Sequence, residues 1–175
     1  MESTKLKLLP LVLVLAVLAP SSEAECATGE KRILGFVERA IISEHGFEVK
    51  ARLDTGARTS SLDAHNIRRF SRGGERYVRF DVIDRDSGDA VTLERPLVRN
   101  VRIRQIGGPP ERRPVVKMWI CVADVMQEVE VNLTDRTDFL YPFLVGRTAM
   151  AGKIVVDPEV SLTTEPSCDM GAFSQ

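Results

Sequence analysis

Short segments in which apolar and polar residues alternate recur along this chain, and they limit its fold more than any other feature. In residues 48–53, for example, Val49, Ala51 and Leu53 alternate with charged residues. Alternation with a period of two places the apolar side chains on one face of a β-strand. Turn-forming residues separate such segments, and only residues 147–151 favour a helix, so we expect a mostly β domain of closed or sandwich-like form. The strand candidates are residues 33–42, 48–53, 77–82, 98–103, 115–122 and 128–133.

The first 24 residues have the layout of a secretory signal peptide. Lys5 and Lys7 precede an apolar run from Leu8 to Leu18, and Ser22-Glu23-Ala24 is a small-x-small cleavage site. The run is shorter than the roughly 20 residues that cross a bilayer, although an uncleaved anchor is the alternative. We therefore expect an exported protein, periplasmic or secreted, with no stable membrane span once the signal is cleaved.

Composition narrows the class of protein to which the chain can belong. With 175 residues, 43% of them apolar, and a net charge of −1, the chain suits one globular domain rather than a disordered tail or a nucleic-acid binder. Cys26 and Cys168 lie near the two ends of the mature chain, where they could pair in an oxidising compartment. Cys121 lies in an apolar run, so we expect it to be a small buried side chain.

The candidate for chemistry is the turn Asp54-Thr55-Gly56-Ala57, which directly follows a predicted strand. Gly56 allows a sharp turn, and the Thr55 hydroxyl can bond to neighbouring backbone, so the turn presents Asp54 on a rigid loop. Two such carboxylates brought together share one proton, so that one acts as a base toward water and the other as an acid. The alternative is a plain turn that Asp54 merely caps.

A longer pattern surrounds this turn. Residues 53–64, with the sequence LDTGARTSSLDA, resemble the signature of the bacterial retropepsin-like aspartic peptidase family often labelled ATP-dependent zinc proteases. Residues 131–136, 141–147 and 153–158 resemble later blocks of the family, in the family's order. The resemblance implies a retropepsin-like closed β-barrel with one short C-terminal helix. The expected parts are the signal peptide (1–24), an N-terminal lead (25–32), the peptidase domain (33–162) and a loose C-terminal tail (163–175).

The resemblance implies an aspartic peptidase, a hydrolase in which an Asp dyad activates water. Because the chain offers one Asp-Thr-Gly, the dyad would form in a homodimer, with Asp54 of each subunit at the two-fold axis. Thr55 would hydrogen-bond across that axis, and Gly56 completes the catalytic turn. Gly146 ends an apolar segment that packs beneath the turn in this fold, and Arg147 leads into the closing helix.

The same resemblance suggests which residues bind a peptide substrate. Ala57 and Arg58 adjoin the catalytic turn, and residues 104–113 form a Gly- and Pro-rich loop that is the candidate flap, with Arg104, Gly107 and Gly108 as its binding residues. Arginines at 104, 112 and 113 would favour an acidic peptide. The alternative for this loop is a plain hairpin connection.

One position departs from the family pattern. In viral retropepsins an acidic residue commonly follows the catalytic turn and pairs with the Gly-Arg arginine, but Arg58 stands there in this chain. We therefore expect Arg147 to find Asp135 or Asp63, or a substrate carboxylate, with Asp135 as structural support. Arg58 itself could lower the pKa of the dyad or bind an acidic group.

Nothing in the sequence supports the ATP or zinc wording of the family label. There is no Gly-rich loop ending in Gly-Lys-Ser/Thr, and the two histidines, His45 and His65, form no His-Glu-x-x-His motif. Asp63 and His65 would make only half a metal site. We expect no cofactor, no metal and no nucleic acid, with a peptide or protein as substrate. A non-catalytic peptide-binding module and a purely structural domain are the alternative functions.

Overall fold

The computed structural model describes residues 30–105, 107–169 and 171 of the chain. The expected signal peptide (1–24) and Cys26 lie outside these residues. Within them, no helix is long and apolar enough to cross a membrane. The strands are β1 (Arg32–Gly35), β2 (Val37–Ile41), β3 (Glu48–Asp54), β4 (Ser60–Asp63), β5 (His65–Arg72), β6 (Glu75–Ile83), β7 (Ala90–Gln105), β8 (Gly108–Val122), β9 (Val125–Thr134), β10 (Phe143–Gly146) and β11 (Ile154–Asp157), and the helix is α1 (Arg147–Met150).

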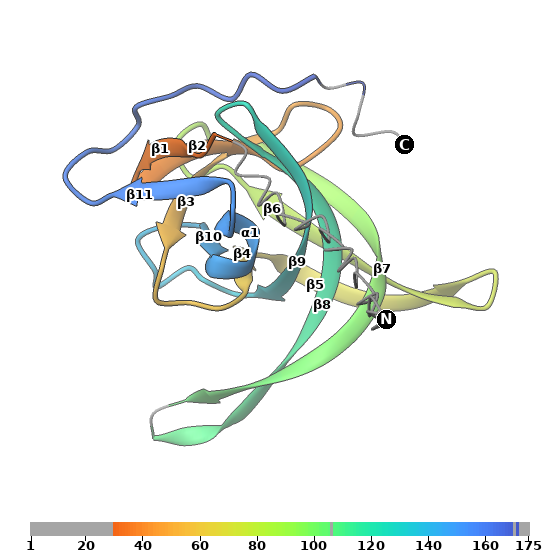
Figure 1. Ribbon diagram of the computed structural model, residues 1–175. Helices are drawn as coiled ribbons and strands as arrows, with labels where there is room; N and C mark the ends of the chain where they lie inside the picture. Colours follow the sequence, from red (N-terminus) through yellow and green to blue (C-terminus); the bar gives the residue numbers. More distant parts are fainter. Residues whose placement is uncertain (1–29, 106, 170, 172–175) are drawn as a thin grey trace, which may run out of the picture.

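Most strands belong to one sheet that returns on itself. Its order is β2-β3-β10-β4-β9-β8-β7-β6-β5, and β2 also pairs with β8 through Ala40 opposite Val122 and Ile41 opposite Cys121. This extra pairing closes β2, β3, β10, β4, β9 and β8 into a ring, while β7 and β8 continue beyond it as a long curved hairpin (Figure 1). The expected mostly β fold with one short helix is therefore confirmed.

The apolar residues that alternate in the sequence form the buried face of this sheet. On β3, Val49, Ala51 and Leu53 are at most 3% exposed, and on β6 Val78, Phe80 and Val82 are fully buried. These side chains join the core residues of β8, β9 and β10, whereas their polar neighbours along the strands face outward. Burial of these apolar faces is the main favourable term that holds the ring together.

The C-terminal segment differs from the expected loose tail. We call residues 162–168 the strap. The carboxylate of Glu38 on β2 is fully buried and accepts hydrogen bonds from the backbone N–H groups of Gly35 (2.8 Å), Thr163 (3.2 Å) and Thr164 (3.1 Å), and from both threonine hydroxyls. A buried carboxylate without such donors is costly, so Glu38 ties the strap to the ring.

The strap also carries the disulfide, and it is not the pairing of Cys168 with Cys26 that the sequence left open. Cys168 bonds to Cys121, with their Cα atoms 6.0 Å apart. The backbone N–H of Ser167 donates to the carbonyl of Ala123 at 2.7 Å, so the strap reaches the β8–β9 turn beside Cys121. The path of the strap decides the pairing, and no local pattern in the sequence indicates that path.

Reducing this disulfide, or replacing Cys121 and Cys168 with serine, should lower the free energy of unfolding by about 3 kcal/mol, because the link closes a long loop. Guanidinium denaturation with and without a thiol reductant measures the change. The double-serine variant is the control, since reductant should leave its midpoint unchanged. An equal midpoint for the oxidised and reduced wild-type protein would contradict a stabilising role for the bond.

Candidate active site

Asp54 is the last residue of β3, and its carboxylate is fixed by the turn that follows. Oδ1 accepts hydrogen bonds from the backbone N–H of Gly56 (2.8 Å) and of Ala57 (3.2 Å), which favours the ionised form. Oδ2 forms no hydrogen bond within the described part of the chain, and the residue is only half-buried. One oxygen is therefore held in place while the other is available to water or a substrate. The Thr55 hydroxyl is exposed and lacks the expected backbone bond among the described residues.

Strand β10 lies beside β3 and supports the turn. The two strands run parallel, with Gly146 opposite Asp54 and Val145 opposite Leu53. A Cβ atom at Gly146 would approach the carbonyl carbon of Thr59 to 2.6 Å, so only glycine fits this close approach. Gly146 therefore packs against the Asp54 turn, where the sequence analysis expected it.

The residues that follow Gly146 bond to the back of the turn. The carbonyl oxygens of residues 55–58 all accept hydrogen bonds from Arg147 and Thr148. Nη1 of Arg147 donates to the carbonyls of Thr55 and Gly56 at 2.8 Å each. The backbone N–H of Arg147 donates to the carbonyl of residue 57 at 2.8 Å. Thr148 donates to the carbonyl of residue 58 through its N–H (3.1 Å) and its hydroxyl (2.9 Å). The backbone that carries Asp54 is thus fixed from behind.

This arrangement corrects the expected partner of Arg147. Its side chain bonds to the turn, and it forms no ion pair with Asp135 or Asp63 in the described structure. Because Arg58 stands where viral retropepsins have an acidic residue, the Arg147 side chain donates instead to the neutral carbonyls of Thr55 and Gly56. Arg58 itself is exposed and lines, with Thr148 and Arg99, a hollow of about 610 Å³.

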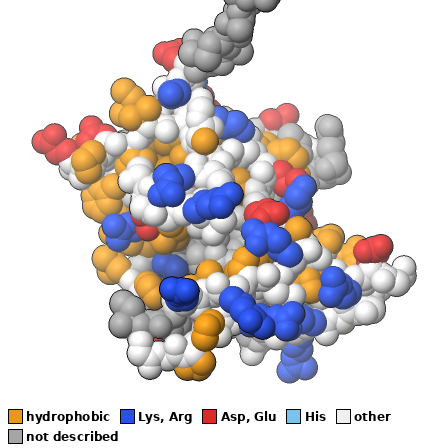
Figure 2. Space-filling view, turned by 60° about the horizontal axis from the view of Figure 1, so that its bottom comes forward, with side chains coloured by type: hydrophobic (Ala, Val, Ile, Leu, Met, Phe, Trp, Pro, Cys, Tyr) orange, Lys and Arg blue, Asp and Glu red, His pale blue; other side chains and the backbone are white. Residues whose placement is uncertain are grey.

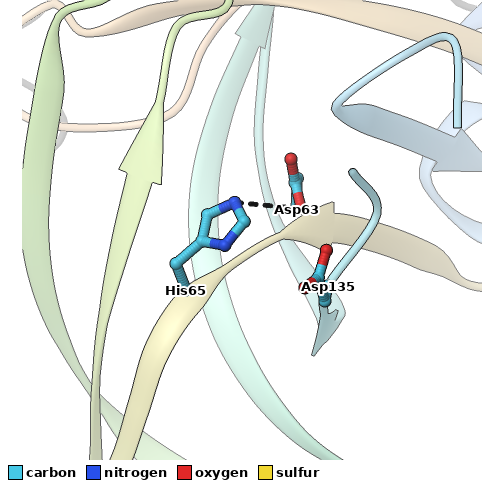
Figure 3. A group of neighbouring side chains, drawn as sticks. All are labelled: Asp63, His65 and Asp135. Atoms are coloured by element: carbon cyan, nitrogen blue, oxygen red, sulfur yellow. Dashed lines mark ion pairs between the residues drawn. The ribbon is translucent and has the colours of Figure 1, made fainter. Parts of the chain in front are cut away.

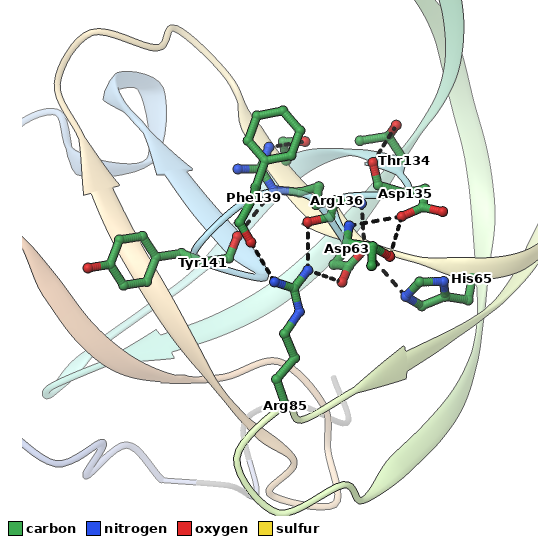
Figure 4. Close-up of polar contacts among 10 residues, drawn as sticks. Asp63, His65, Arg85, Thr134, Asp135, Arg136, Phe139 and Tyr141 are labelled. Carbon is green, nitrogen blue, oxygen red and sulfur yellow. Dashed lines mark hydrogen bonds and ion pairs between the residues drawn. The ribbon is translucent and has the colours of Figure 1, made fainter.

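Asp63, at the end of β4, belongs to a separate polar cluster (Figure 4). It is buried; its Oδ2 lies 2.5 Å from Nη2 of Arg85, and its Oδ1 accepts the backbone N–H of Arg136 at 2.6 Å. Arg85 also donates to the carbonyls of Arg136 (2.7 Å) and Phe139 (2.5 Å). The cluster therefore holds the loop after β9 against β4. Asp135, expected to support Arg147, instead accepts from Thr137, and these bonds lower its pKa.

The same place holds the one candidate group of metal ligands among the described residues. Ligand atoms of Asp63, His65 and Asp135 lie within 4.8 Å of one another (Figure 3). However, both oxygens of Asp63 are already engaged, one of them by the guanidinium of Arg85, and His65 Nε2 points at Asp63 Oδ1 from 3.4 Å. A dication here would face the Arg85 charge, so these residues do not fit a zinc site.

A comparison with known protein families shows to which family the chain belongs. Residues 33–166 match the RimB-like family, described as retropepsin-like aspartic endopeptidase RimB. The chain belongs to this family. The expected membership of a retropepsin-like family is thereby confirmed, while the ATP-dependent zinc protease label forms no part of the description.

The chain is also similar to part of several longer proteins that carry a different name. A probable alpha-L-glutamate ligase of Shewanella pealeana is 40% identical over 115 residues, 65% of this chain and 25% of the ligase. One of Desulfotalea psychrophila is 33% identical over 150 residues, 83% of this chain and 31% of the ligase. The chain thus spans about a quarter to a third of these relatives. A crystal structure of protein Lpg0085, of unknown function, from Legionella pneumophila superposes with a TM-score of 0.68 at 36% identity, covering 78% of this chain and all of that one.

The candidate flap of this RimB-like domain is more regular than its sequence suggests. Most of residues 104–113, expected as a loop, are strand: β7 ends at Gln105 and β8 begins at Gly108. Prolines are tolerated because a two-stranded ribbon leaves alternate N–H groups unpaired. Arg104, Gly107 and Gly108 are exposed near the hairpin end, and among the described residues no hydrogen bond joins them to the Asp54 turn.

Replacing Gly146 with alanine should destabilise the protein by about 1–3 kcal/mol, since the added Cβ meets rigid backbone at Thr59. Thermal or denaturant unfolding gives the change in stability. The matched comparison is Thr148→Ala, which deletes one hydroxyl hydrogen bond to Arg58 without adding atoms and should cost only about 1 kcal/mol. Equal stability of Gly146→Ala and wild type would rule out the close contact.

Proposed function

We propose that this chain is an aspartic peptidase in which Asp54 of two subunits activates a water molecule. The observation that carries the proposal is the Asp54 turn itself, with Oδ1 bonded to backbone, Oδ2 unbonded and the carbonyls of residues 55–58 held from behind. A catalytic carboxylate needs such fixed geometry, because small displacements of a reacting group are costly in rate. The retropepsin-like endopeptidase description of the family supports the same reaction.

The chemistry follows from two carboxyl groups that share one proton. The ionised Asp54 removes a proton from the water as its oxygen attacks the peptide carbonyl carbon. The protonated Asp54 of the other subunit donates to the carbonyl oxygen, which becomes the hydroxyl of a tetrahedral intermediate. Collapse of this intermediate breaks the C–N bond as the proton taken from water passes to the departing amine. One hydroxyl of the intermediate returns its proton to the other Asp54, which yields the carboxyl product and restores the shared proton of the pair.

A surface beside the turn suits the second copy. Thr55 borders a hollow of about 460 Å³ whose apolar lining includes Met150, Ile154 and Val155. Ile33 on β1 and Val155 on β11 are direct strand partners, and they are 72% and 45% exposed. Apolar side chains exposed next to a turn that supplies half of a dyad favour a two-fold interface between copies of this chain.

For the substrate, we propose a peptide rich in glutamate. The similar regions of the curated relatives belong to proteins named as glutamate ligases, and a peptidase breaks the kind of bond that joins amino acids. Lys and Arg side chains gather on the face that lies at the bottom of Figure 1, with few acidic ones among them (Figure 2). Such a surface attracts acidic peptides and raises their rate of association.

We also propose that the protein acts outside the cytoplasm, in the periplasm or after secretion. The Cys121–Cys168 disulfide supports this location, because such bonds persist mainly in oxidising compartments.

A second candidate function is a binding module without catalysis. It draws support from the relatives, in which the similar region makes up 25–31% of a chain named as a ligase. In that case the surface around the Asp54 turn would hold a glutamate-rich peptide, and the wild-type protein would bind it without cleaving it.

Replacing Asp54 with asparagine should reduce cleavage of a fluorogenic hexaglutamate peptide by at least about a hundredfold, because the general base is lost. Circular dichroism and solution mass should stay unchanged, since asparagine keeps the shape of the side chain. A statine-type inhibitor should block cleavage by the wild-type protein, whereas a metal chelator should leave the cleavage rate unchanged. Binding without any cleavage by the wild type would favour the second candidate and sink the peptidase proposal.

Replacing Val155 with aspartate should shift a dimer toward monomer and lower activity in parallel, since a buried charge opposes the apolar contact. Analytical ultracentrifugation over a range of concentrations, with assays on the same samples, gives both quantities. Ile83→Asp is the matched control, because Ile83 is also an exposed apolar residue (37%) but lies at the end of β6. A fully active wild-type monomer would overturn the dimer.

A further inference from the structure

Two arginines with little compensating charge lie together near the Asp54 turn. Arg113 is on β8, and Arg136 follows β9. Arg136 is 7% exposed, and the side chain of Arg113 is 14% exposed. Both guanidinium groups reach one hydrogen-bonded pair: Nη1 of Arg113 donates to Asn132, Nη1 of Arg136 donates to Ser61, and the Ser61 hydroxyl donates to Asn132. Burial lowers the pKa of Arg136, and the nearby charge of Arg113 lowers it further.

The described residues supply one carboxylate to this pair. Glu111 pairs with Arg113 at 2.6 Å, and Nη1 of Arg113 also donates to Asn132 at 3.3 Å, but its buried Nε has no partner. Arg136 forms no ion pair within the described part of the chain. Its guanidinium makes two long hydrogen bonds of 3.4 Å, to the carbonyl of Tyr141 and the hydroxyl of Ser61.

The nearest other acid is already neutralised. Asp63 accepts the backbone N–H of Arg136, while its second oxygen pairs with Arg85. Among the described residues, Arg113 therefore has one carboxylate partner and Arg136 has none, and a buried charge without a partner is unfavourable. A second carboxylate would balance the pair and complete the hydrogen bonding that Arg113 Nε lacks.

The position of the pair connects it to the reacting centre. Ser61, which Arg136 contacts, lies on β4 opposite Leu144 of β10, and two residues further along β10 Gly146 lies opposite Asp54. One strand thus separates the two sites, and the charge of Asp54 acts on Arg136.

A groove of about 920 Å³ is lined by residues that contact the pair, while the two arginines themselves lie behind its wall. Its lining includes Glu111, the partner of Arg113, and Phe139, whose ring centroid lies 4.4 Å from the guanidinium carbon of Arg136. The Phe139 ring is 51% exposed, so it covers Arg136 from a side that a ligand can reach. Figure 4 shows this ring beside Arg136, with Arg85 and Asp63 on the other side of the loop.

We propose that Arg113 and Arg136 form a receptor for one carboxylate side chain of the substrate, near the bond that is cleaved. The proposal rests on the proposed function for the nature of the substrate, and it assigns the residues that select an acidic side chain. The planar guanidinium groups match a carboxylate with paired hydrogen bonds, which an amide of the same shape cannot reproduce. The pair therefore discriminates glutamate from glutamine at one position of the peptide.

Binding to the Asp54→Asn protein tests this without depending on cleavage. The probes are fluorescein-labelled hexaglutamate and the six hexapeptides in which one glutamate is replaced by glutamine, followed by fluorescence anisotropy. The Asp54→Asn protein that keeps both arginines should bind hexaglutamate at least about tenfold more tightly than one of the glutamine peptides. This difference is expected for a hydrogen-bonded charge. When Arg136→Met or Arg113→Met is added to the Asp54→Asn protein, hexaglutamate and that glutamine peptide should bind equally tightly. The affinities of the other five peptides relative to hexaglutamate should not change.

Arg102→Met is the matched control, since Arg102 is an exposed arginine of the same hairpin and its loss removes the same charge. It should weaken binding of all the peptides equally and by less than about threefold. If Arg136→Met fails to fold, Arg136→Lys keeps the charge without the paired donors and should reduce the selectivity.

The outcomes separate the two proposals. Unchanged glutamate selectivity in folded variants of both arginines overturns the receptor, even if the wild type cleaves hexaglutamate. Position-specific loss of selectivity supports the receptor, even if the wild type proves to bind without cleaving.

Discussion

The hydrogen bonds from Arg147 and Thr148 to the carbonyls of residues 55–58 are the interaction on which the rest of the site depends. They are possible because β10 runs parallel to β3 and ends at Gly146, opposite Asp54, where any side chain would meet Thr59. A strand, a glycine and an arginine about ninety residues away in the sequence thus fix one carboxylate. The closed ring keeps both strands in register, and its packed apolar interior resists the small shifts that would move Asp54.

The position of Arg58 shows how one geometry is kept with different chemistry. Where the viral pattern places an acid to receive the Gly-Arg arginine, Arg147 here donates to neutral carbonyls of the turn. The two acids that sequence reasoning offered to Arg147 serve elsewhere: Asp63 binds Arg85, and Asp135 binds Thr137. An arginine can change partner type because its several donors accept any oxygen in the right place.

The parts predicted from sequence are those that local patterns encode. Period-two alternation identified the strands of Val49 and Val78, and the Asp54 turn and Gly146 stood out because each combines a strand end with a glycine. The parts missed depend on contacts distant in sequence. The Arg85–Asp63 pair and the Cys121–Cys168 bond join segments whose meeting follows from the path of the chain, which neither segment indicates alone. A buried carboxylate such as Asp63 does imply some partner, but not which one.

Charged groups without a full set of partners occur at two places in this chain. On our proposal Asp54 supplies one acid of a pair, next to exposed Thr55 and Val155. Arg113 and Arg136 are two mostly buried cations that have one ion-pair partner, Glu111, among the described residues. The second feature is a cost to the stability of the chain, because a buried charge without a partner is unfavourable. On our proposal an acidic peptide relieves this cost, and its binding energy is then released next to the Asp54 turn.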